Sequence, residues 1–566
     1  MKAYLVFGIA AVVFIVVVFI KGAWDEKKKK KDFIRKLYEE YGSVPQRKYG
    51  PEQYASIARF FERHASDEQI DDITWNDLSF DDIFKRINCT YSSAGEEYLY
   101  YRLRTPVDSP EELKHFDEIC NYFGQNPDVR VKVQYTLARL GRTGKFSLYD
   151  YLDHLDVLGK RSNLKHHIVN GLFIPAVACL FVEPSLGVLF FILLSIYNMI
   201  SYFKEKSEID SYITSFAYVM RLLGAADELG MMKIDACEKE ISKIKFHKQK
   251  LGRFRRGSYW LMSSGRMSGS GNLLDIFMDY LRMLLHIDLI KFNSMLAQIR
   301  LTVEDVNVLA ETIGYLECAI VAGSFRESLK DRWCRPVFTQ GGIFRAENLY
   351  HPLIEDPVRN SISTDKGVLI TGSNASGKST FLKTVAVGAI LAQTIYTCPA
   401  DVYEGDFYHI CSSMALRDDL TGGESYYIVE IKSIKRILDF AEVSKHKVLC
   451  FVDEVLRGTN TVERIAASSQ ILRKLTGENV LCFAATHDIE LTSLLENEYN
   501  NYHFEEDMED GDIHFNYLLK PGKATSRNAI RLLQIIGYDQ EIIEQANRQA
   551  VGFLETGLWK MGEVRK

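Results

Sequence analysis

The sequence lacks the signals that mark disulfide-stabilised or metal-bound proteins. Its ten cysteines are scattered singly, with no C-x-x-C pair and no spacing typical of metal ligands. Four of them (Cys179, Cys318, Cys450 and Cys482) lie in apolar runs, where a thiol behaves as a small hydrophobic group. We therefore expect a reducing compartment and no structural metal.

The chain also lacks a strong positive charge and the composition of a disordered polymer. A formal net charge of -6 gives no general attraction to nucleic acid or to an acidic membrane, so any site for a polyanion must be a local patch. Of the 566 residues, 47% are hydrophobic and 25% are charged. Such a chain can form about three or four domains with cores of their own.

Two long apolar blocks are present. The first, Ala3–Ile20, would span roughly 27 Å as a helix, which matches the hydrocarbon core of a bilayer. The basic run Lys27–Lys31 follows it without a small-residue cleavage site, which favours a retained anchor over a signal peptide. The second block, Ile168–Phe203, is interrupted by Glu183, Pro184 and Ser185, which predicts two short spans joined by a tight turn. The alternative is a helical hairpin buried in a soluble core.

Basic residues flank these blocks on consistent sides. Lys27–Lys31 follow the first span, Lys160, Arg161 and Lys165 precede the second, and Lys204 and Lys206 follow the third. All three clusters are cytoplasmic only if the N-terminus lies outside. The sequence thus predicts a cell-membrane protein with three spans, whose larger segments face the cytoplasm.

The predicted secondary structure changes along the chain. Helical patterns with few breakers dominate up to about Asp331, and short β-rich runs separated by helical stretches follow from about Cys334. This order predicts an all-α region followed by an α/β domain with a parallel sheet. The predicted segments are a transmembrane anchor with its basic stop at 1–31, a first helical core part at 32–165, a transmembrane hairpin at 166–204, a second helical core or lever part at 205–333, an α/β domain at 334–520 and a C-terminal helical element at 521–566.

A glycine-rich loop lies between a predicted strand and a predicted helix. The stretch GSNASGKS fits G-x-x-x-x-G-K-[ST], follows the apolar run Gly367–Thr371 and opens the helical pattern Thr380–Ala392. Its backbone N–H groups can wrap phosphates, Lys378 can reach the β- and γ-phosphates, and the Ser379 hydroxyl can ligate Mg²⁺. The predicted nucleotide-binding residues are Gly372, Ser373, Asn374, Ala375, Ser376, Gly377, Lys378, Ser379 and Thr380.

Two later strands end in polar residues. The run VLCFVDE places Asp453 to bind Mg²⁺ and Glu454 to activate the attacking water, and a positioned general base is worth about 10²- to 10⁴-fold in rate. The run FAATHD ends in His487, which can donate a hydrogen bond to the γ-phosphate. Glu454 and His487 are the predicted catalytic residues.

The stretch DDLTGGESYYIVE, Asp418–Glu430, is termed the signature stretch below. Its two glycines precede a segment with apolar residues at helical spacing, so Ser425 falls at a predicted helix N-terminus, which attracts anions. In ATPases of the ABC superclass such a helix closes over the γ-phosphate of the opposite subunit, which would make Ser425 act in trans. An ordinary helix cap explains Ser425 equally well in isolation.

Four motifs together resemble the MutS family, DNA mismatch-repair ATPases of the ABC superclass. They are GSNASGKST, DDLTGGESYYIVE, DEVLRGTN and ATHD, in that order and at family-like spacing. The resemblance implies a C-terminal P-loop ATPase domain of ABC type, ATP and Mg²⁺ as ligands, two composite sites in a homodimer, and DNA as a partner. The C-terminal stretch from Pro521 is similar to the family's helical dimerisation element.

The sequence also departs from the family. The segment between the anchor and Cys89 is too short for the family's mismatch-reading and connector domains, so direct mismatch reading is not expected. Phe60-x-Glu62 matches the family's wedge motif, but it lies in a charged helical pattern and is interpreted as part of an amphipathic helix.

One basic cluster interleaves cations with aromatic residues. Lys248, Lys250, Arg253, Arg255 and Arg256 are the candidate DNA contacts. A solvated helix face, or a face on anionic lipid headgroups, is equally compatible.

These observations predict a membrane-anchored MutS-like ATPase that binds mismatched or branched DNA in an ATP-dependent manner. The alternative is an ABC-type membrane transport or remodelling ATPase without DNA binding. It draws on LTGGE, Leu420–Glu424, which resembles the transporter signature L-S-G-G-Q.

Overall fold

The structure is a computed structural model that describes residues 2–255, 280–339, 341–373, 376–414, 426–444, 446–457, 459–509, 512–524, 529–557 and 559. For some of these, including residues 2–19, only the backbone is described. The chain forms two compact units. The helical unit comprises Met1–Ala65, Asn88–Tyr101 and Glu118–Ser328, and the α/β unit comprises Ser66–Ile87, Arg102–Asp117 and Leu329–Lys566. The α/β unit therefore contains two segments from early in the chain, whereas the segment boundaries predicted above are contiguous and stay a prediction.

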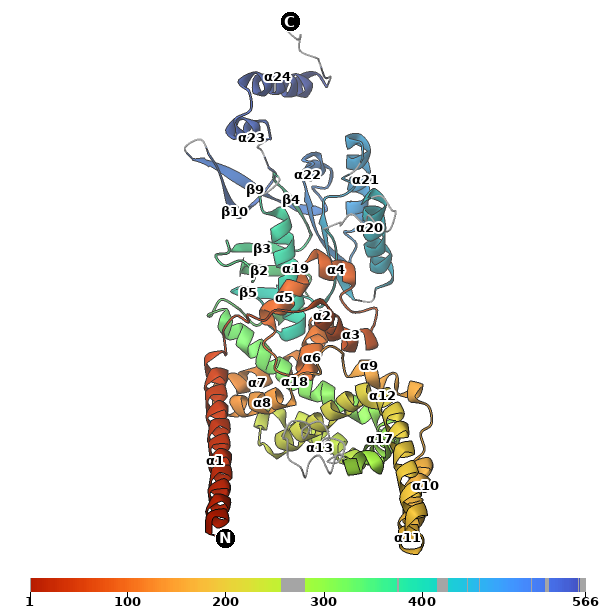
Figure 1. Ribbon diagram of the computed structural model, residues 1–566. Coiled ribbons are helices and arrows are strands. Elements are labelled where there is room, and N and C mark those ends of the chain that lie inside the picture. The colour runs from red at the N-terminus through yellow and green to blue at the C-terminus, as the bar shows by residue number, and fades with distance from the viewer. Residues whose placement is uncertain are drawn as a thin grey trace. The chain divides into compact units, whose positions relative to one another are not determined.

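The helical unit is built from long and short helices, most of which are labelled in Figure 1. They are α1 (Lys2–Glu39), α2 (Pro51–Ile57), α3 (Arg59–Arg63), α6 (Ser93–Arg104), α7 (Pro110–Gln125), α8 (Pro127–Leu140), α9 (Tyr149–Leu152), α10 (Leu164–Gly171), α11 (Phe173–Val182), α12 (Pro184–Met231), α13 (Glu238–Lys250), α14 (Gly252–Arg255), α17 (Ile287–Ile299) and α18 (Val303–Ser328). Helices α6 and α7 contribute residues to both units.

The core of the helical unit forms around α18. This helix is apolar on most of its circumference and is buried along nearly its whole length, as expected for a helix without a polar face. Phe60, on α3, is also buried and packs against Tyr98, Tyr101 and Tyr149. Its burial confirms the interpretation of this segment as an amphipathic helix.

The apolar block after residue 164 forms a helical hairpin. Leu164–Val182 and Pro184–Asp210 are long and apolar enough to cross a membrane, and only 17% and 22% of their apolar windows are buried. The turn falls at Glu183, as predicted, but α12 continues to Met231, well beyond the predicted end of the block at Phe203. Because most of this apolar surface is exposed, the hairpin is not a buried part of a soluble core within this chain.

Two further helices bear on the predicted spans. By length and composition α18 is a third candidate span, but 78% of its window is buried inside the unit. The first predicted span, Ala3–Ile20, has helical backbone within α1, and its side chains before Ile20 lie outside the described residues. The membrane location stays a prediction.

The α/β unit contains two sheets. The strands are β1 (Val337–Phe338), β2 (Phe344–Leu349), β3 (Asn360–Thr364), β4 (Gly367–Thr371), β5 (Val402–Gly405), β6 (Tyr408–Ser413), β7 (Lys447–Asp453), β8 (Val480–Thr486), β9 (Tyr499–Glu509) and β10 (Asp512–Pro521). The larger sheet has the order β10-β9-β4-β8-β7-β6, in which β9 to β6 are parallel and β10 is antiparallel to β9. The smaller sheet has the order β1-β5-β2-β3 and is mostly antiparallel.

The helices of this unit are α4 (Asp72–Asp77), α5 (Phe80–Ile87), α19 (Lys378–Ile395), α20 (Tyr426–Val443), α21 (Thr461–Lys474), α22 (Glu490–Leu494), α23 (Ala529–Ile536) and α24 (Gln540–Thr556). The helical N-terminal region and the α/β C-terminal region confirm the coarse fold prediction. The middle strands β4, β7 and β8 are almost wholly buried, which explains why they read as continuous apolar runs.

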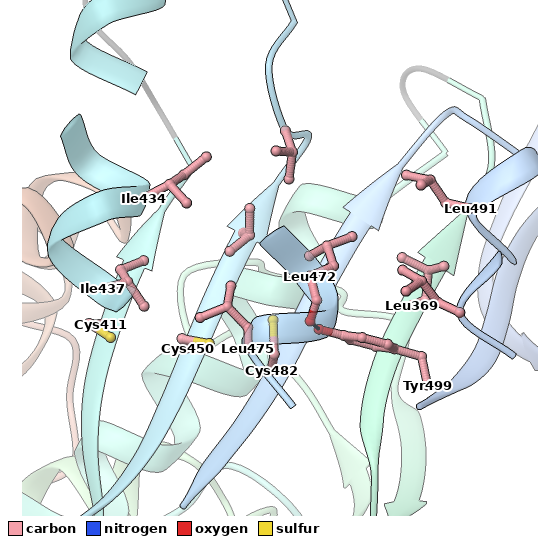
Figure 2. Packing of buried hydrophobic residues seen from close by; sticks show 14 of the residues in the cluster. Leu369, Cys411, Ile434, Ile437, Cys450, Leu472, Leu475, Cys482, Leu491 and Tyr499 are labelled. Atoms are coloured by element: carbon pink, nitrogen blue, oxygen red, sulfur yellow. Dashed lines mark hydrogen bonds between the residues drawn. The ribbon is translucent and has the colours of Figure 1, made fainter. Parts of the chain in front are cut away.

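A single apolar cluster fixes one face of the larger sheet (Figure 2). Cys411, Cys450 and Cys482 lie at matching register positions on three adjacent strands. Ile437 of α20 and Leu472 of α21 pack against the same cluster. This packing sets the position of α20 and α21 over the sheet and thereby the position of the loops at the ends of its strands.

Candidate nucleotide site

Three parallel strands bring the predicted site residues together. Strand β4 leads into the glycine-rich loop, β7 ends at Asp453, and β8 ends at Thr486, next to His487. Strand β8 pairs with both β4 and β7, so the carboxyl ends of all three meet at one edge of the sheet. Ligands of open α/β sheets bind at this edge.

The glycine-rich loop has the backbone of a phosphate cradle. Gly372 and Gly377 have φ values of 152° and 105°, which side chains rarely adopt, and a Cβ at Gly377 would lie 3.1 Å from the Tyr517 ring. The Ser376 hydroxyl is buried and has no hydrogen-bond partner among the residues that the structure describes. Helix α19 begins directly after the loop, at Lys378, so its N-terminal N–H groups point toward the same place. Asn374 and Ala375 lie outside the described residues.

Lys378 lies over the loop. Its Nζ donates to the carbonyl oxygens of Gly372 and Ser373 at 2.8 and 2.7 Å. The ammonium group is thereby held where a bound phosphate would meet it.

Asp453 and Ser379 lie side by side, as the predicted metal pair requires. Burial raises the pKa of Asp453, and a hydrogen bond from Ser379 and the nearby charges of Arg457 and Lys378 oppose that effect. A carboxylate and a hydroxyl at this spot are the hard oxygen ligands that Mg²⁺ prefers. The donor set therefore fits the metal.

Glu454 and His487 are in contact. The His487 Nδ1 lies 3.2 Å from the Glu454 Oε1, and the Arg457 Nε lies 2.6 Å from the other carboxylate oxygen. Burial acts to raise the pKa of Glu454, but the His487 hydrogen bond and the Arg457 charge outweigh it and hold the pKa below its usual range. The same hydrogen bond raises the pKa of His487. The pair therefore keeps Glu454 ionised, as a base must be, and holds His487 beside it as a hydrogen-bond donor.

A cavity of about 680 Å³ opens over these groups. Ser373, Gly377, Lys378, Ser379 and Glu454 line one side. The other side is formed mainly by the β2–β3 connection and the β9–β10 hairpin, through His351, Ile354, Pro357, Phe504 and Tyr517, among others. The volume is that of a small-molecule site with polar groups gathered at one end.

The structure adds residues whose roles the sequence reasoning missed. Arg457 was only a letter of the DEVLRGTN motif, yet it pairs with Glu454 and lines the cavity. Glu430 ends the signature stretch, and its Oε1 accepts a hydrogen bond of 2.6 Å from the Leu456 backbone. Their positions within the two sequence motifs could have indicated that both residues belong to the site. Phe504 and Tyr517 carried no such signal, because only the sheet order brings β9 and β10 to this edge.

The signature stretch is described only in part. Ser425 lies outside the described residues, so its predicted action in trans stays a prediction. Helix α20 begins at Tyr426, which agrees with a helix start at the end of the stretch.

The predicted DNA contacts lie on α13 and α14 and form ion pairs within the helical unit. Lys248 and Arg255 both pair with Asp227, the former at 2.8 Å, and Lys250 pairs with Asp305 at 3.1 Å. Arg253 is exposed on α14, and Arg256 lies outside the described residues. A phosphate at this face would have to compete with two aspartates.

The fold and the site define an α/β unit whose parallel strands bring a glycine-rich loop and Glu454 to one cavity, where Asp453 contacts Ser379 and His487 contacts Glu454. Residues 368–553 match the family profile described as MutS domain V. DNA mismatch repair protein MutS of Thermus thermophilus is 31% identical over 248 residues, which are 43% of this chain and 29% of that protein. The MutS proteins of Roseiflexus castenholzii and Natronomonas pharaonis are 31% and 27% identical over 42% and 45% of this chain, and over 23% and 31% of their own lengths.

The C-terminal part of the chain thus carries a domain of the MutS family and is similar in sequence to MutS proteins. The matched part spans less than a third of the length of these curated relatives. The family prediction made from the four motifs is confirmed.

Proposed function

We propose that the α/β unit is an ATPase domain of ABC type that hydrolyses ATP with Mg²⁺. The observation that carries this proposal is that Lys378, Ser379 and Glu454 line one cavity, while Asp453 contacts Ser379 and His487 contacts Glu454. A buried carboxylate is costly, and the buried Asp453 and the partly buried Glu454 beside a lysine and a histidine are typical of a reaction site.

Each group has a role that its contacts support. Lys378 and the loop N–H groups bind the phosphates, and the unpartnered Ser376 hydroxyl supplies a further donor. Ser379 and Asp453 would hold Mg²⁺, which neutralises charge developing on the β- and γ-phosphate oxygens. Glu454 accepts the proton of the attacking water, and His487 donates to the γ-phosphate and orients Glu454.

Arg457 sets the resting state of the base in this proposal. The Arg457 guanidinium forms an ion pair with Glu454. While this ion pair is present, one oxygen of the carboxylate is not free to accept a proton from water. Release of Arg457 toward phosphate would free Glu454 at the moment that ATP is bound.

We further propose that two copies of the chain complete the site. The support is the signature stretch, whose helix α20 starts at Tyr426, and the family relationship. The exposed apolar residues Ile536, Tyr538, Ile542 and Val551 of the α23–α24 region suit a contact between copies.

DNA is the proposed macromolecular partner, because the relatives named above are DNA mismatch repair proteins. The α13–α14 face is the proposed contact, and its ion pairs with Asp227 and Asp305 predict weak, salt-sensitive binding. A mismatched or branched DNA is the proposed ligand.

A bilayer is the proposed partner of the α11–α12 hairpin. Phe181, Val182 and Ile174 are 86%, 83% and 75% exposed, which is unfavourable in water and favourable in lipid. Alkaline carbonate extraction of membranes tests this proposal: the chain should stay in the pellet, and release of the chain would contradict it.

The test of the ATPase proposal is turnover by detergent-solubilised full-length protein, with Glu454→Gln as the inactive control. Homoduplex, mismatched and branched DNA are added separately at low salt. Turnover that requires Glu454 and changes with one DNA form supports both proposals. Turnover that is indifferent to every DNA contradicts DNA engagement and favours the alternative of a membrane transport or remodelling ATPase. No turnover above the control contradicts the ATPase proposal.

A further inference from the structure

Helix α4, from early in the chain, contacts the end of strand β6 inside the α/β unit. Asp77 is 3% exposed, and its Oδ2 accepts hydrogen bonds from the Ser412 hydroxyl at 2.7 Å and from the Met414 backbone N–H at 2.9 Å. The Thr74 hydroxyl accepts a third, from the Ser412 backbone N–H at 3.0 Å. Helix α4 thus fixes the backbone of Ser412–Met414, which leads toward the signature stretch.

The same helix also holds α20, which follows the signature stretch. Arg436 of α20 donates to the Ser412 carbonyl oxygen at 2.6 Å and forms an ion pair with Asp71. The other carboxylate oxygen of Asp71 caps α4 by accepting from the Thr74 N–H at 2.7 Å. The chain before the signature stretch and the helix after it are therefore tied to one short element.

A third contact connects α20 to the catalytic residues. Glu430 accepts the hydrogen bond from the Leu456 N–H, two residues after Glu454. Glu454 and Leu456 have φ values of 62° and 60°, so this turn is held in a conformation that side chains rarely adopt. Any shift of α20 would act on the turn that carries Glu454.

From these contacts we infer that Asp71 and Asp77 are positioning residues for ATP turnover. They fix α20 and the end of β6 relative to the sheet, and none of the described residues that line the cavity comes from α4. The inference rests on the proposed ATPase function. The segment 66–87 precedes all four nucleotide motifs by hundreds of residues. The inference gives this segment a part in the reaction.

Stability alone does not explain this choice of residues. A buried carboxylate loses its hydration, which is unfavourable unless it is fully hydrogen-bonded, and an apolar side chain of similar size usually stabilises the fold as well. A carboxylate that accepts hydrogen bonds from a hydroxyl and a backbone N–H instead fixes the orientation of the groups that donate them. The segment Ser66–Ile87, which carries α4, is connected at both of its ends to the helical unit. A movement of α20 would therefore act on residues that are covalently continuous with that unit.

The experiment compares four variants of the full-length protein in detergent. Asp71→Asn removes the charge that pairs with Arg436 but keeps a good helix cap, and Arg436→Gln removes the other partner. Asp77→Asn alters the buried contact. Lys447→Gln is the matched control, because it breaks the ion pair with Asp406 at the opposite ends of strands β6 and β7.

We expect kcat to fall roughly ten-fold or more in Asp71→Asn, Arg436→Gln and Asp77→Asn, since small misplacements of catalytic groups cost rate. The Kd of a fluorescent ATP analogue and the melting temperature should stay near those of the wild type, and Lys447→Gln should retain its kcat. This split between turnover and binding would not arise from a merely structural role.

Two results would overturn the inference while leaving the ATPase proposal intact. One is wild-type kcat in Asp71→Asn and Arg436→Gln. The other is a parallel loss of nucleotide binding, melting temperature and kcat, which would make α4 a structural support only. If Asp77→Asn does not fold, the variants of the half-exposed Asp71–Arg436 pair still test the inference. If the wild type itself shows no turnover above Glu454→Gln, the proposed function fails first and the inference falls with it.

Discussion

Both units bury glutamates, but they do so in opposite ways. Glu317 of α18 is 2% exposed and accepts hydrogen bonds from the Tyr91 N–H at 2.5 Å, the Ser92 N–H at 3.3 Å and the Ser92 hydroxyl. Its donors close around it at the start of α6. Glu454 instead faces a cavity, and its neighbours His487 and Arg457 are groups that can move or change charge.

The difference shows what separates a structural carboxylate from a reactive one. Burial raises the pKa of Glu317 to about 7, although all its hydrogen bonds oppose this effect. The pKa of Glu454 is lowered in spite of burial, because its partners are cationic. A perturbed pKa alone therefore does not mark the site. Access to a cavity and convergence with other reactive groups do.

The same substitution in the two units should separate the two roles, and the largest effect is expected at Glu454. Glu454→Gln removes the base and should lower kcat by about 10²- to 10⁴-fold while nucleotide binding is retained. Steady-state turnover and equilibrium binding of a fluorescent ATP analogue measure the two quantities. A variant that turns over at the wild-type rate would remove Glu454 from the mechanism.

Glu317→Gln should leave kcat unchanged and alter stability instead. The folded carboxyl binds its proton more tightly than the unfolded chain, whose usual pKa is 4.5, so stability falls as pH rises from 4.5 toward 7. The neutral amide abolishes this fall, a difference on the order of 3 kcal/mol across the window. Urea unfolding followed by pulse proteolysis at pH 5 and pH 8 measures it. An identical pH dependence in wild type and variant would contradict the assignment.

A glycine in each unit sharpens the comparison further. A Cβ at Gly95 would lie 2.5 Å from the Glu317 Cδ, so Gly95→Ala should destabilise the helical unit by about 1–3 kcal/mol. Gly377→Ala forces a side chain onto a φ of 105° in the phosphate loop and should weaken nucleotide binding several-fold. Thermal unfolding and nucleotide titration of both variants test this pairing. The prediction would be contradicted if Gly95→Ala weakened nucleotide binding and Gly377→Ala lowered the stability of the helical unit.

The smallest effect concerns the charge on His487. Below its raised pKa the imidazolium pairs with Glu454 and weakens it as a base, and this pairing is lost as the pH rises through that pKa. The wild-type kcat should therefore rise with pH through an apparent pKa above 6.5. In His487→Asn the rise should move to lower pH, because the group that titrates above 6.5 is gone. Coincident pH–rate profiles would exclude His487 from the titration.

The sequence by itself determined the family and most of the candidate site. Three apolar runs that end in GSNASGKS, Asp453–Glu454 and His487 had to be buried parallel strands, and the ends of such strands meet at one edge of a sheet. The turn of the apolar hairpin at Glu183 was likewise predictable, because a charge and a proline interrupt the run. These features depend on residues close together in the sequence.

Only the tertiary structure decided which distant residues act together. Arg457 binds Glu454, β9 and β10 wall the cavity, and Lys248, Lys250 and Arg255 form ion pairs with aspartates instead of a free basic face. Helix α4 joins β6 and α20 across more than 330 positions of sequence. The physical reason is that hydrogen bonds and ion pairs depend on side-chain positions to within about 1 Å. A local pattern of residue types fixes which face is buried, but it does not fix the partner on that face.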